Sequence, residues 1–279
     1  MPSIEIRRFA RPGIGSVNSF AIDLPGSVIL IDGQRELSSA RQALTDLNPD
    51  GKPISAVFLT HPHPDHFGGI GVFVEAGKGC PYYASQQTHD SIAEDRMGFI
   101  AKSREVVGDD FPETVTLPNR ILTPNQSVAI EGLTIETREM GEGESECMTV
   151  LHLPESGDLF PADIIQHRMT AFLLEGRLDA WLDQIEALRR DFPEVRTIHA
   201  GHGASGTPDA LLSYQQTYLE TFKRLVAEEI AEGELIAGAA ERITSRMQEV
   251  YPDFEPVAAI PDLLELNIAP VAKAIGDEA

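Results

Sequence analysis

The sequence contains little of what marks a secreted or nucleic-acid-binding protein. It has 2 cysteines among 279 residues, too few for a disulfide framework, so we expect a reducing compartment. Its 22 lysines and arginines face 44 aspartates and glutamates, which gives a formal net charge of −22. Because such a field repels phosphate backbones and anionic lipids, we expect neither nucleic acid nor a membrane as a partner.

Long apolar runs are missing as well. No stretch approaches the roughly 20 apolar residues that cross a bilayer, and the start MPSIEIRRFARPGIG lacks the apolar core of a secretory signal. These features predict a cytoplasmic protein. Apolar residues make up 42% of the chain and charged residues 24%, which is ordinary for a globular protein with a substantial core.

Strand-like and helical patterns alternate along the first two thirds of the chain. We expect strands at 4–10, 16–23, 27–33, 54–60, 81–85, 127–140, 148–154, 157–163 and 195–200. We expect helices at 38–47, capped by Ser38 or Ser39, and at 67–76, 86–94, 177–191 and 208–231. Residues 95–118 fit a helix followed by a loop. The alternation predicts a mixed α/β body.

After Pro208 the pattern changes. The segment 209–251 contains no strand-like run and is predicted to be helical throughout. Its apolar side chains include one stripe at helical spacing, formed by Tyr214, Tyr218, Phe222 and Leu225. We therefore divide the chain into a body, residues 1–205, and a helical extension, residues 206–279, which packs on the body or forms a homodimer interface.

The stretch THPHPDHFGG, residues 60–69, concentrates metal-binding side chains where a strand meets a loop. Period-two spacing in an extended segment puts His61 and His63 on the same side, whereas Asp65 and His66 turn away as the next helix opens. Burying imidazoles this densely without partners would be costly. A ligand set divided between two neighbouring points suits two metal ions about 3.5–4 Å apart that share a bridging hydroxide.

This stretch resembles the His-x-His-x-Asp-His signature of the metallo-β-lactamase superfamily, including the preceding threonine and the trailing glycines. The resemblance covers roughly residues 4–205. It implies an α/β (α+β) fold, a four-layer αββα sandwich with metal ions at one edge of the sheets, here with a helical C-terminal extension. It also implies two further ligands: Asp163 in LFPAD as the bridging aspartate, and His202 in HAGHG as the last histidine.

One motif departs from the family pattern. Members commonly carry a histidine in GHTxG nineteen residues before the bridging aspartate, and counting back from Asp163 (163 − 19 = 144) gives Glu144 in MGEGESECMTV. Glu142 and Glu146 are the alternatives if the loop is shifted. Two histidines and a glutamate form a zinc set and also suit Fe(II) or Mn(II). A degenerate first site, in which Glu144 contacts no metal, is the other interpretation.

The resemblance implies a dinuclear metal-dependent hydrolase with two divalent ions, zinc first and manganese or iron as alternatives. A metal-bridging hydroxide would attack the carbonyl of a small ester, lactone or thioester. Asp65 would orient the hydroxide and deliver a proton to the leaving group. His167, four residues after Asp163, lies where members often place substrate-pocket residues, and it is the second candidate catalytic residue. Asp32, in LIDG, is expected to orient the ligand loop through hydrogen bonds.

Other functions stay open. Superfamily members that resemble persulfide dioxygenases hold a single iron through two histidines and a carboxylate, and His61, His63, Glu144 and Asp163 could supply such a site. A β-lactamase-type amide hydrolase and a metal-binding protein with little catalysis are further alternatives. Two subfamily markers are missing: Gln166 holds the place of a tyrosine found in many acylhomoserine lactonases, and the ending VAKAIGDEA lacks the basic residues of hydroxyacylglutathione hydrolases.

Overall fold

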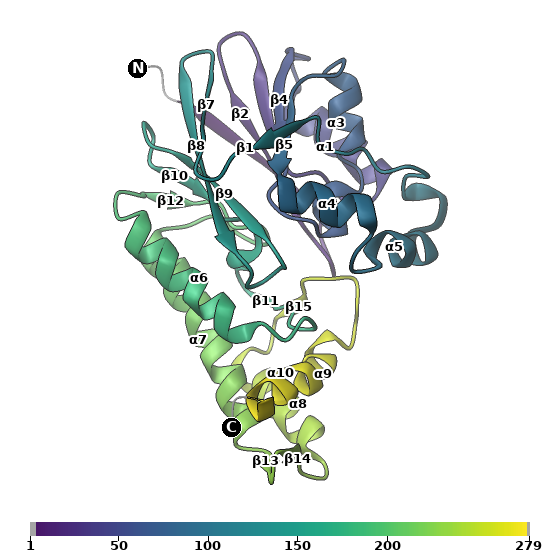
Figure 1. Ribbon diagram of the computed structural model, residues 1–279, viewed down its shortest axis with the longest axis vertical. Helices are drawn as coiled ribbons and strands as arrows, with labels where there is room; N and C mark the ends of the chain where they lie inside the picture. Colours follow the sequence, from purple (N-terminus) through teal and green to yellow (C-terminus); the bar gives the residue numbers. More distant parts are fainter. Residues whose placement is uncertain (1–3, 278–279) are drawn as a thin grey trace.

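Two β-sheets lie face to face, and helices cover their outer surfaces (Figure 1). The computed structural model describes residues 4–277; the outermost residues of the two predicted domains, 1–3 and 278–279, lie outside this range. Between the sheets, apolar side chains from alternate strand positions meet, for example Phe20 and Phe58 from one sheet with Leu151 and Phe160 from the other. The predicted αββα sandwich is confirmed.

The first sheet contains six strands in sequence order: β1 (Glu5–Ala10), β2 (Asn18–Asp23), β3 (Val28–Ile31), β4 (Ile54–Phe58), β5 (Tyr82–Ser85) and β6 (Arg120–Leu122). β1, β2 and β3 are antiparallel, whereas β3 to β6 are parallel. Parallel strands end at the same edge of a sheet. The loops that follow β3 and β4 therefore lie side by side at that edge.

The second sheet has the order β12 (Thr197–Ile198), β10 (Asp158–Phe160), β9 (Met148–Leu153), β8 (Leu133–Gly141) and β7 (Ser127–Ile130). The run predicted as one strand at 127–140 is instead the β7–β8 hairpin. Its turn, Glu131–Gly132, has φ values of 49° and 84°. Consecutive positive φ values suit a two-residue hairpin turn, which the glycine makes accessible.

Helices α1 (Leu37–Leu47), α2 (Pro64–Phe67), α3 (Gly71–Ala76), α4 (Gln86–Glu94) and α5 (Phe99–Val107) lie on the side of the first sheet, with the short turn η1 (Gly108–Asp110). The segment predicted as one helix at 67–76 is two, because the chain turns at Gly68–Ile70. A Cβ at Gly69 would meet Ala40 and the backbone of Gln34. The predicted serine cap of α1 is also wrong: Glu36 holds that position, and Ser38 bonds Asp110.

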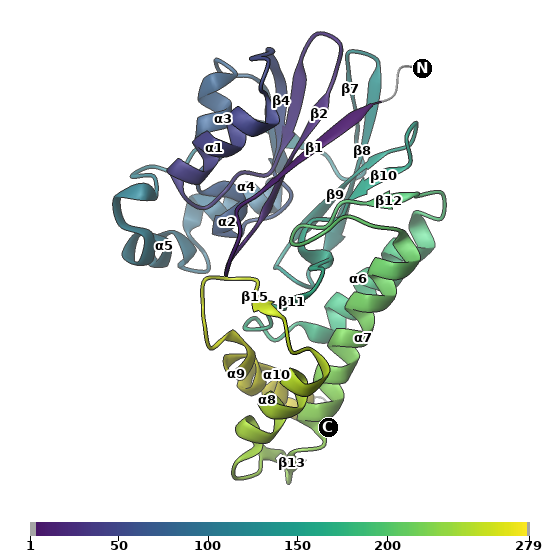
Figure 2. The same cartoon turned by 180° about the vertical axis from the view of Figure 1, so that it is seen from behind.

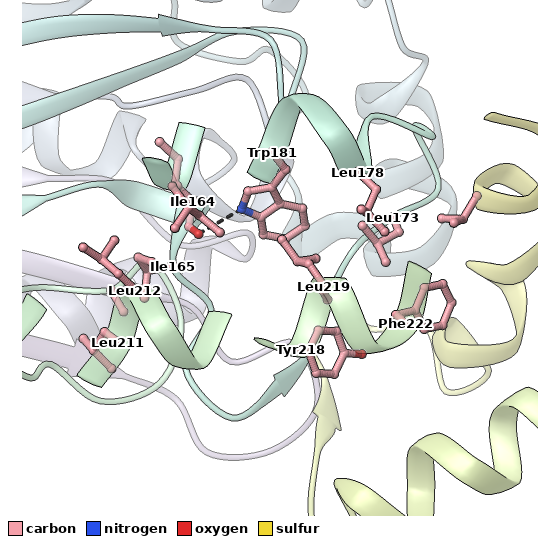
Figure 3. Close-up of a cluster of buried hydrophobic side chains, with 14 of the residues drawn as sticks. Ile164, Ile165, Leu173, Leu178, Trp181, Leu211, Leu212, Tyr218, Leu219 and Phe222 are labelled. Carbon is pink, nitrogen blue, oxygen red and sulfur yellow. Dashed lines mark hydrogen bonds between the residues drawn. The ribbon is translucent and has the colours of Figure 1, made fainter. Parts of the chain in front are cut away.

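Helices α6 (Leu178–Asp191) and α7 (Pro208–Ala227) cover the second sheet, as Figure 2 shows from behind. Beyond them lie α8 (Ala239–Val250), α9 (Leu263–Leu266) and α10 (Ile268–Asp277). In Figure 3 the Trp181 ring of α6 packs among apolar side chains that include Leu219 and Phe222 of α7, while its Nε1 donates to Ile164 O at 2.9 Å. Residues on both sides of the predicted boundary share this core; the boundary at 205 and the homodimer stay predictions.

The extension is not helical throughout. α7 ends at Ala227, and β13 (Ile230–Ala231) and β14 (Glu234–Leu235) form a hairpin around Glu232–Gly233. Farther on, β15 (Glu255–Pro256) pairs in parallel with β11 (Met169–Thr170) of the body. Strands of two residues leave no periodic pattern, which is why the sequence did not reveal them. Within residues 4–277, no helix is both long and apolar enough to cross a membrane.

Candidate metal centre

Asp32 fixes the histidine-rich loop at the end of β4. Its Oδ1 accepts a hydrogen bond from Thr60 N at 2.9 Å, and its Oδ2 accepts one from Thr60 Oγ1 at 2.8 Å. The same Oδ2 lies 2.9 Å from His66 Nδ1. These bonds leave His66 Nε2 as the atom available to a metal ion. The hydrogen bonds expected of Asp32 from the sequence are present.

A first ligand group contains His61, His63, Glu144 and Asp163, which offer one ligand atom each within 4.8 Å of one another. His63 Nδ1 lies 3.6 Å from Glu144 Oε1, and His61 Nε2 lies 4.0 Å from Glu144 Oε2. His61 Nε2 is also 3.9 Å from Asp163 Oδ2. All four side chains are buried. The structure therefore brings the variant residue Glu144 to the two histidines.

A second group contains Asp65, His66 and His202. His202 Nε2 lies 3.6 Å from Asp65 Oδ2 and 2.9 Å from Asp163 Oδ2, while His66 Nε2 lies 3.1 Å from Asp163 Oδ1. Asp163 thus reaches both groups. Asp32, His61 and His66 form a third combination within the same distance, but both oxygens of Asp32 already accept hydrogen bonds.

Four buried atoms show that these groups fit a cation. His61 Nε2 and Glu144 Oε2 have no hydrogen-bond partner among the described residues, and neither have His66 Nε2 and Asp163 Oδ1, although these two atoms lie 3.1 Å apart. Buried polar groups without partners are rare because each costs free energy. All four atoms belong to residues of the two ligand groups, and imidazole nitrogens with carboxylate oxygens are ligands of zinc, iron and manganese. A divalent cation in each group would satisfy them.

The protonation states lead to the same conclusion. Burial lowers the pKa of His61 well below its ordinary value, and the nearby His66 adds to this. Burial raises the pKa of Glu144 to about 8. Burial opposes ionisation of Asp163, yet His202 and His66 hold its pKa well below its ordinary value. The side chains around Glu144 therefore do not supply enough positive charge to keep its carboxylate ionised, and a bound cation would supply that charge.

The alternatives to Glu144 lie elsewhere. The Glu142 side chain is 69% exposed and lies 3.6 Å from Arg177 Nε, and Glu146 faces Arg96 at 3.8 Å. Neither belongs to a ligand group among the described residues. Glu144 is held by Gln184, whose Oε1 accepts from Glu144 N at 3.2 Å.

His167 stands apart from the other predicted site residues. All seven predicted ligands fall into the ligand groups, whereas the His167 ring packs against Tyr214 with centroids 5.3 Å apart. Its backbone N donates to His202 O at 3.0 Å, so it supports the loop that carries a ligand. The catalytic roles of His167 and Asp65 stay predictions.

Two supporting residues have no recognisable motif. Glu175 Oε1 lies 3.1 Å from His63 Nε2 and also bonds Arg177, so it holds the His63 ring with Nδ1 turned to Glu144. Gln166 Nε2 donates to Glu144 Oε1 at 3.1 Å and lies 3.4 Å from Asp163 Oδ2. In the sequence, Gln166 marked only a missing tyrosine. Its position between two carboxylates depends on the folded loop.

A cavity of about 280 Å³ opens above the ligand groups. Its floor includes His63, Asp65, Glu144, Asp163 and His202. Its wall is largely apolar and comes mainly from three segments: α5, residues 172–174 and residues 257–260 of the extension. Arg35, on the loop between β3 and α1, also lines it. The extension, expected only to pack on the body or to join two subunits, therefore also completes this cavity.

Comparison with known families supports this geometry. The model of the metallo-β-lactamase superfamily matches residues 12–231. The chain belongs to the metallo-β-lactamase superfamily. The matched region contains all seven candidate ligands of this superfamily member. No curated protein matches the sequence.

Solved structures with the same fold are distant in sequence. A metallo-β-lactamase from Pontibacter korlensis is 20% identical with a TM-score of 0.61, over 78% of this chain and 99% of that one. The inverting sec-alkylsulfatase Pisa1 from Pseudomonas sp. is 18% identical with a TM-score of 0.66, over 95% of this chain and 48% of that one. The present superfamily member spans about half the length of the sulfatase. At this identity the likeness concerns the fold.

Proposed function

We propose that the protein is a metal-dependent hydrolase that acts on a small ester, lactone or thioester. The observation that carries the proposal is the pair of ligand groups that Asp163 connects, with four buried ligand atoms that have no hydrogen-bond partner among the described residues. The superfamily match over residues 12–231 supports a metalloenzyme. The structures with the same fold include a metallo-β-lactamase and an alkylsulfatase, both named for hydrolytic reactions.

Two divalent cations, one held by His61, His63 and Glu144 and one by Asp65, His66 and His202, with Asp163 between them, would polarise the substrate carbonyl and lower the pKa of bound water. The chain's own residues supply the positions. Asp32 and Glu175 orient His66 and His63, and Gln166 spans Glu144 and Asp163. These hydrogen bonds orient the candidate ligands before substrate arrives, which lowers the reorganisation needed during the reaction.

Asp65 is the candidate proton carrier. Its side chain is 14% exposed, whereas those of His202 and Asp163 are 0% and 3% exposed. It also lines the cavity. A carboxylate in that position can accept a proton from the attacking water and transfer it to the leaving group. The apolar wall would hold the organic part of the substrate and limit the water that enters.

The oxygenase alternative uses only the first ligand group. Under that alternative, the burial of Asp65, His66 and His202 around a common point would serve no reaction. We therefore favour hydrolysis with two cations, zinc first.

Metal analysis of protein purified without added salts, combined with a panel of esters, lactones, thioesters, β-lactams and alkyl sulfates, tests the proposal. We expect two equivalents of zinc or manganese and chelator-sensitive hydrolysis of a carbonyl substrate. One equivalent of iron with oxygen uptake would refute hydrolysis and favour the dioxygenase. Less than half an equivalent of any metal would favour a degenerate site.

A further inference from the structure

Arg35 is a cation in the cavity wall that no acidic side chain among the described residues neutralises. It lies on the loop between β3 and α1, next to the histidine-rich loop, where Gly33 N donates to His66 O at 2.6 Å. It forms no ion pair with any carboxylate of residues 4–277, and its buried Nε has no hydrogen-bond partner. In a chain with twice as many acidic as basic residues, an arginine in a cavity without an acidic partner requires an explanation.

The other cation of the cavity differs. Lys102 Nζ lies 2.9 Å from Glu105 Oε2, and the two side chains are 66% and 70% exposed. It is a paired surface residue. The guanidinium of Arg35, by contrast, lies beside Gly15 and near the extension, because a Cβ at Gly15 would lie 2.9 Å from Arg35 Nη2 and 3.0 Å from Ala259 N. Arg35 therefore lies where the body meets the extension, without an acidic partner among residues 4–277.

The carboxylates around the ligand groups do not neutralise Arg35. Asp65, Glu144 and Asp163 belong to the two groups, and Asp32, which accepts hydrogen bonds beside His66, adds a fourth negative charge. Two divalent cations would balance these four charges, and Glu175 bonds Arg177. Arg35 therefore remains as a positive charge in the cavity wall with which an anionic group of the substrate can pair.

The rest of the wall is suited to a hydrocarbon chain. Phe99, Ser103 and Val106 recur at helical spacing on one face of α5, and Phe172 and Leu174 come from the segment after β11. The extension adds Val257 and Ile260. Its segment is fixed on both sides, since Gly15 N donates to Pro256 O and Val257 N donates to Thr170 O, each at 3.1 Å.

We propose that the substrate is an anionic acyl compound, with an ester, lactone or thioester carbonyl over the ligand groups, an apolar chain against α5 and the extension, and a carboxylate paired with Arg35. This proposal rests on the proposed hydrolase function and narrows its substrate class. Arginine suits the role because its fork of N–H donors binds a carboxylate through two hydrogen bonds.

Two matched substrate series test the proposal. The first series contains p-nitrophenyl monoesters of dicarboxylic acids from succinic to sebacic acid, which keep one free carboxylate. The second contains p-nitrophenyl esters of monocarboxylic acids with the same numbers of carbons, which are uncharged. We expect the metal-loaded protein to prefer one or more members of the first series. Arg35→Met should lower kcat/KM for those members by about 10- to 100-fold, the range for a hydrogen bond to a charged group. Its kcat/KM for the uncharged esters should stay unchanged.

Two further variants complete the comparison. Arg35→Lys should keep part of the preference for the charged esters, because the positive charge remains while the pair of hydrogen bonds that a guanidinium makes is lost. Arg41→Met, which removes an exposed arginine of α1 outside the cavity, should behave as the wild type. Equal kcat/KM for both series in the wild type, or a preference that survives in Arg35→Met, would overturn the assignment.

Binding without reaction separates this inference from the hydrolase proposal. Titration calorimetry with hexane-1-sulfonate and with hexan-1-ol requires no hydrolysis. We expect the sulfonate to bind the wild type about tenfold or more tightly than Arg35→Met, and the alcohol to bind both equally. If no ester is hydrolysed but this difference in sulfonate affinity appears, the anion site at Arg35 is supported and the proposed hydrolase reaction is wrong. If the sulfonate binds both proteins equally, the anion site is wrong, whether or not esters are hydrolysed.

Discussion

The floor and the wall of the cavity are built in different ways. The floor consists of buried imidazoles and carboxylates that Asp32, Glu175 and Gln166 hold in place through hydrogen bonds. The wall consists mainly of apolar side chains from α5, residues 172–174 and residues 257–260, whose positions depend on packing and on backbone hydrogen bonds and not on hydrogen bonds between the side chains. Hydrogen bonds fix atoms to fractions of an ångström, whereas packing fixes a shape. We therefore expect changes in the floor to affect metal binding and changes in the wall to affect substrate choice.

Removing the shared carboxylate should damage the floor most. Asp163→Ala takes a ligand from both groups, so we expect metal affinity to fall by more than the roughly 10- to 100-fold that loss of a ligand's supporting partner costs. Metal content by mass spectrometry and hydrolysis should fall together. Asp158→Ala is the matched control, because Asp158 bonds His199 at 2.8 Å and lies outside the ligand groups. Full metal content in Asp163→Ala would show that the two groups do not share this residue.

Glu175→Gln tests whether a residue without a motif belongs to the floor. Loss of the carboxylate beside His63 Nε2 should lower the affinity of the first metal by about 10- to 100-fold. Competition with a chromogenic chelator measures this affinity. Glu142→Gln provides the control, since Glu142 also faces Arg177 but is mostly exposed. Equal metal affinities for Glu175→Gln and Glu142→Gln would show that Glu175 does not support the first metal site.

Ile260→Ala tests the wall. Truncating this apolar side chain should lower kcat/KM for long-chain esters by about tenfold or more, since one methylene in an apolar pocket is worth ~1–3 kcal/mol. Metal content should not change. Leu266→Ala, at a residue of α9 that is 48% exposed, should change neither quantity. A loss of metal in Ile260→Ala would contradict the separation of floor and wall.

The smallest expected effect concerns the protons of Glu144. Burial raises the pKa of this carboxyl to about 8, so below that pH the metal-free protein holds a proton on Glu144 that a metal must displace. Affinity should therefore rise as the pH rises towards 8, and this dependence should level off above it. Calorimetry in two buffers with different ionisation enthalpies should show about one proton more released by the wild type than by Glu144→Gln. Equal proton release would show that Glu144 binds no metal.

Most of the floor could be predicted from the sequence, because its ligands follow short motifs at strand ends. The stretch 60–69 and the spacing between Glu144 and Asp163 identified residues that the fold indeed brings together. Glu175 and Gln166 could not be found in this way. Their roles depend on the path of the loops at 165–177, which bring a carboxylate to His63 and an amide to Glu144.

The wall was less accessible to prediction for a related reason. Val257 and Ile260 lie in an extension that sequence patterns described as helical, and the parallel pairing of β15 with β11 that positions them involves two residues on each side. No motif in the sequence identifies Arg35 as a candidate binding residue. Its importance depends on the absence of an acidic neighbour among the described residues, and that absence is a property of the folded molecule.

By itself, the sequence determined the α/β fold, the superfamily and the set of candidate ligand side chains. These depend on strand and helix periodicity and on residues close together along the chain. Only the tertiary structure decided three things: which residues orient those side chains, which segments line the cavity, and which cation in the cavity lacks an acidic partner. Such contacts join residues from separate elements, as His63 and Glu175 are 112 positions apart, and their strength depends on burial, which no local pattern specifies.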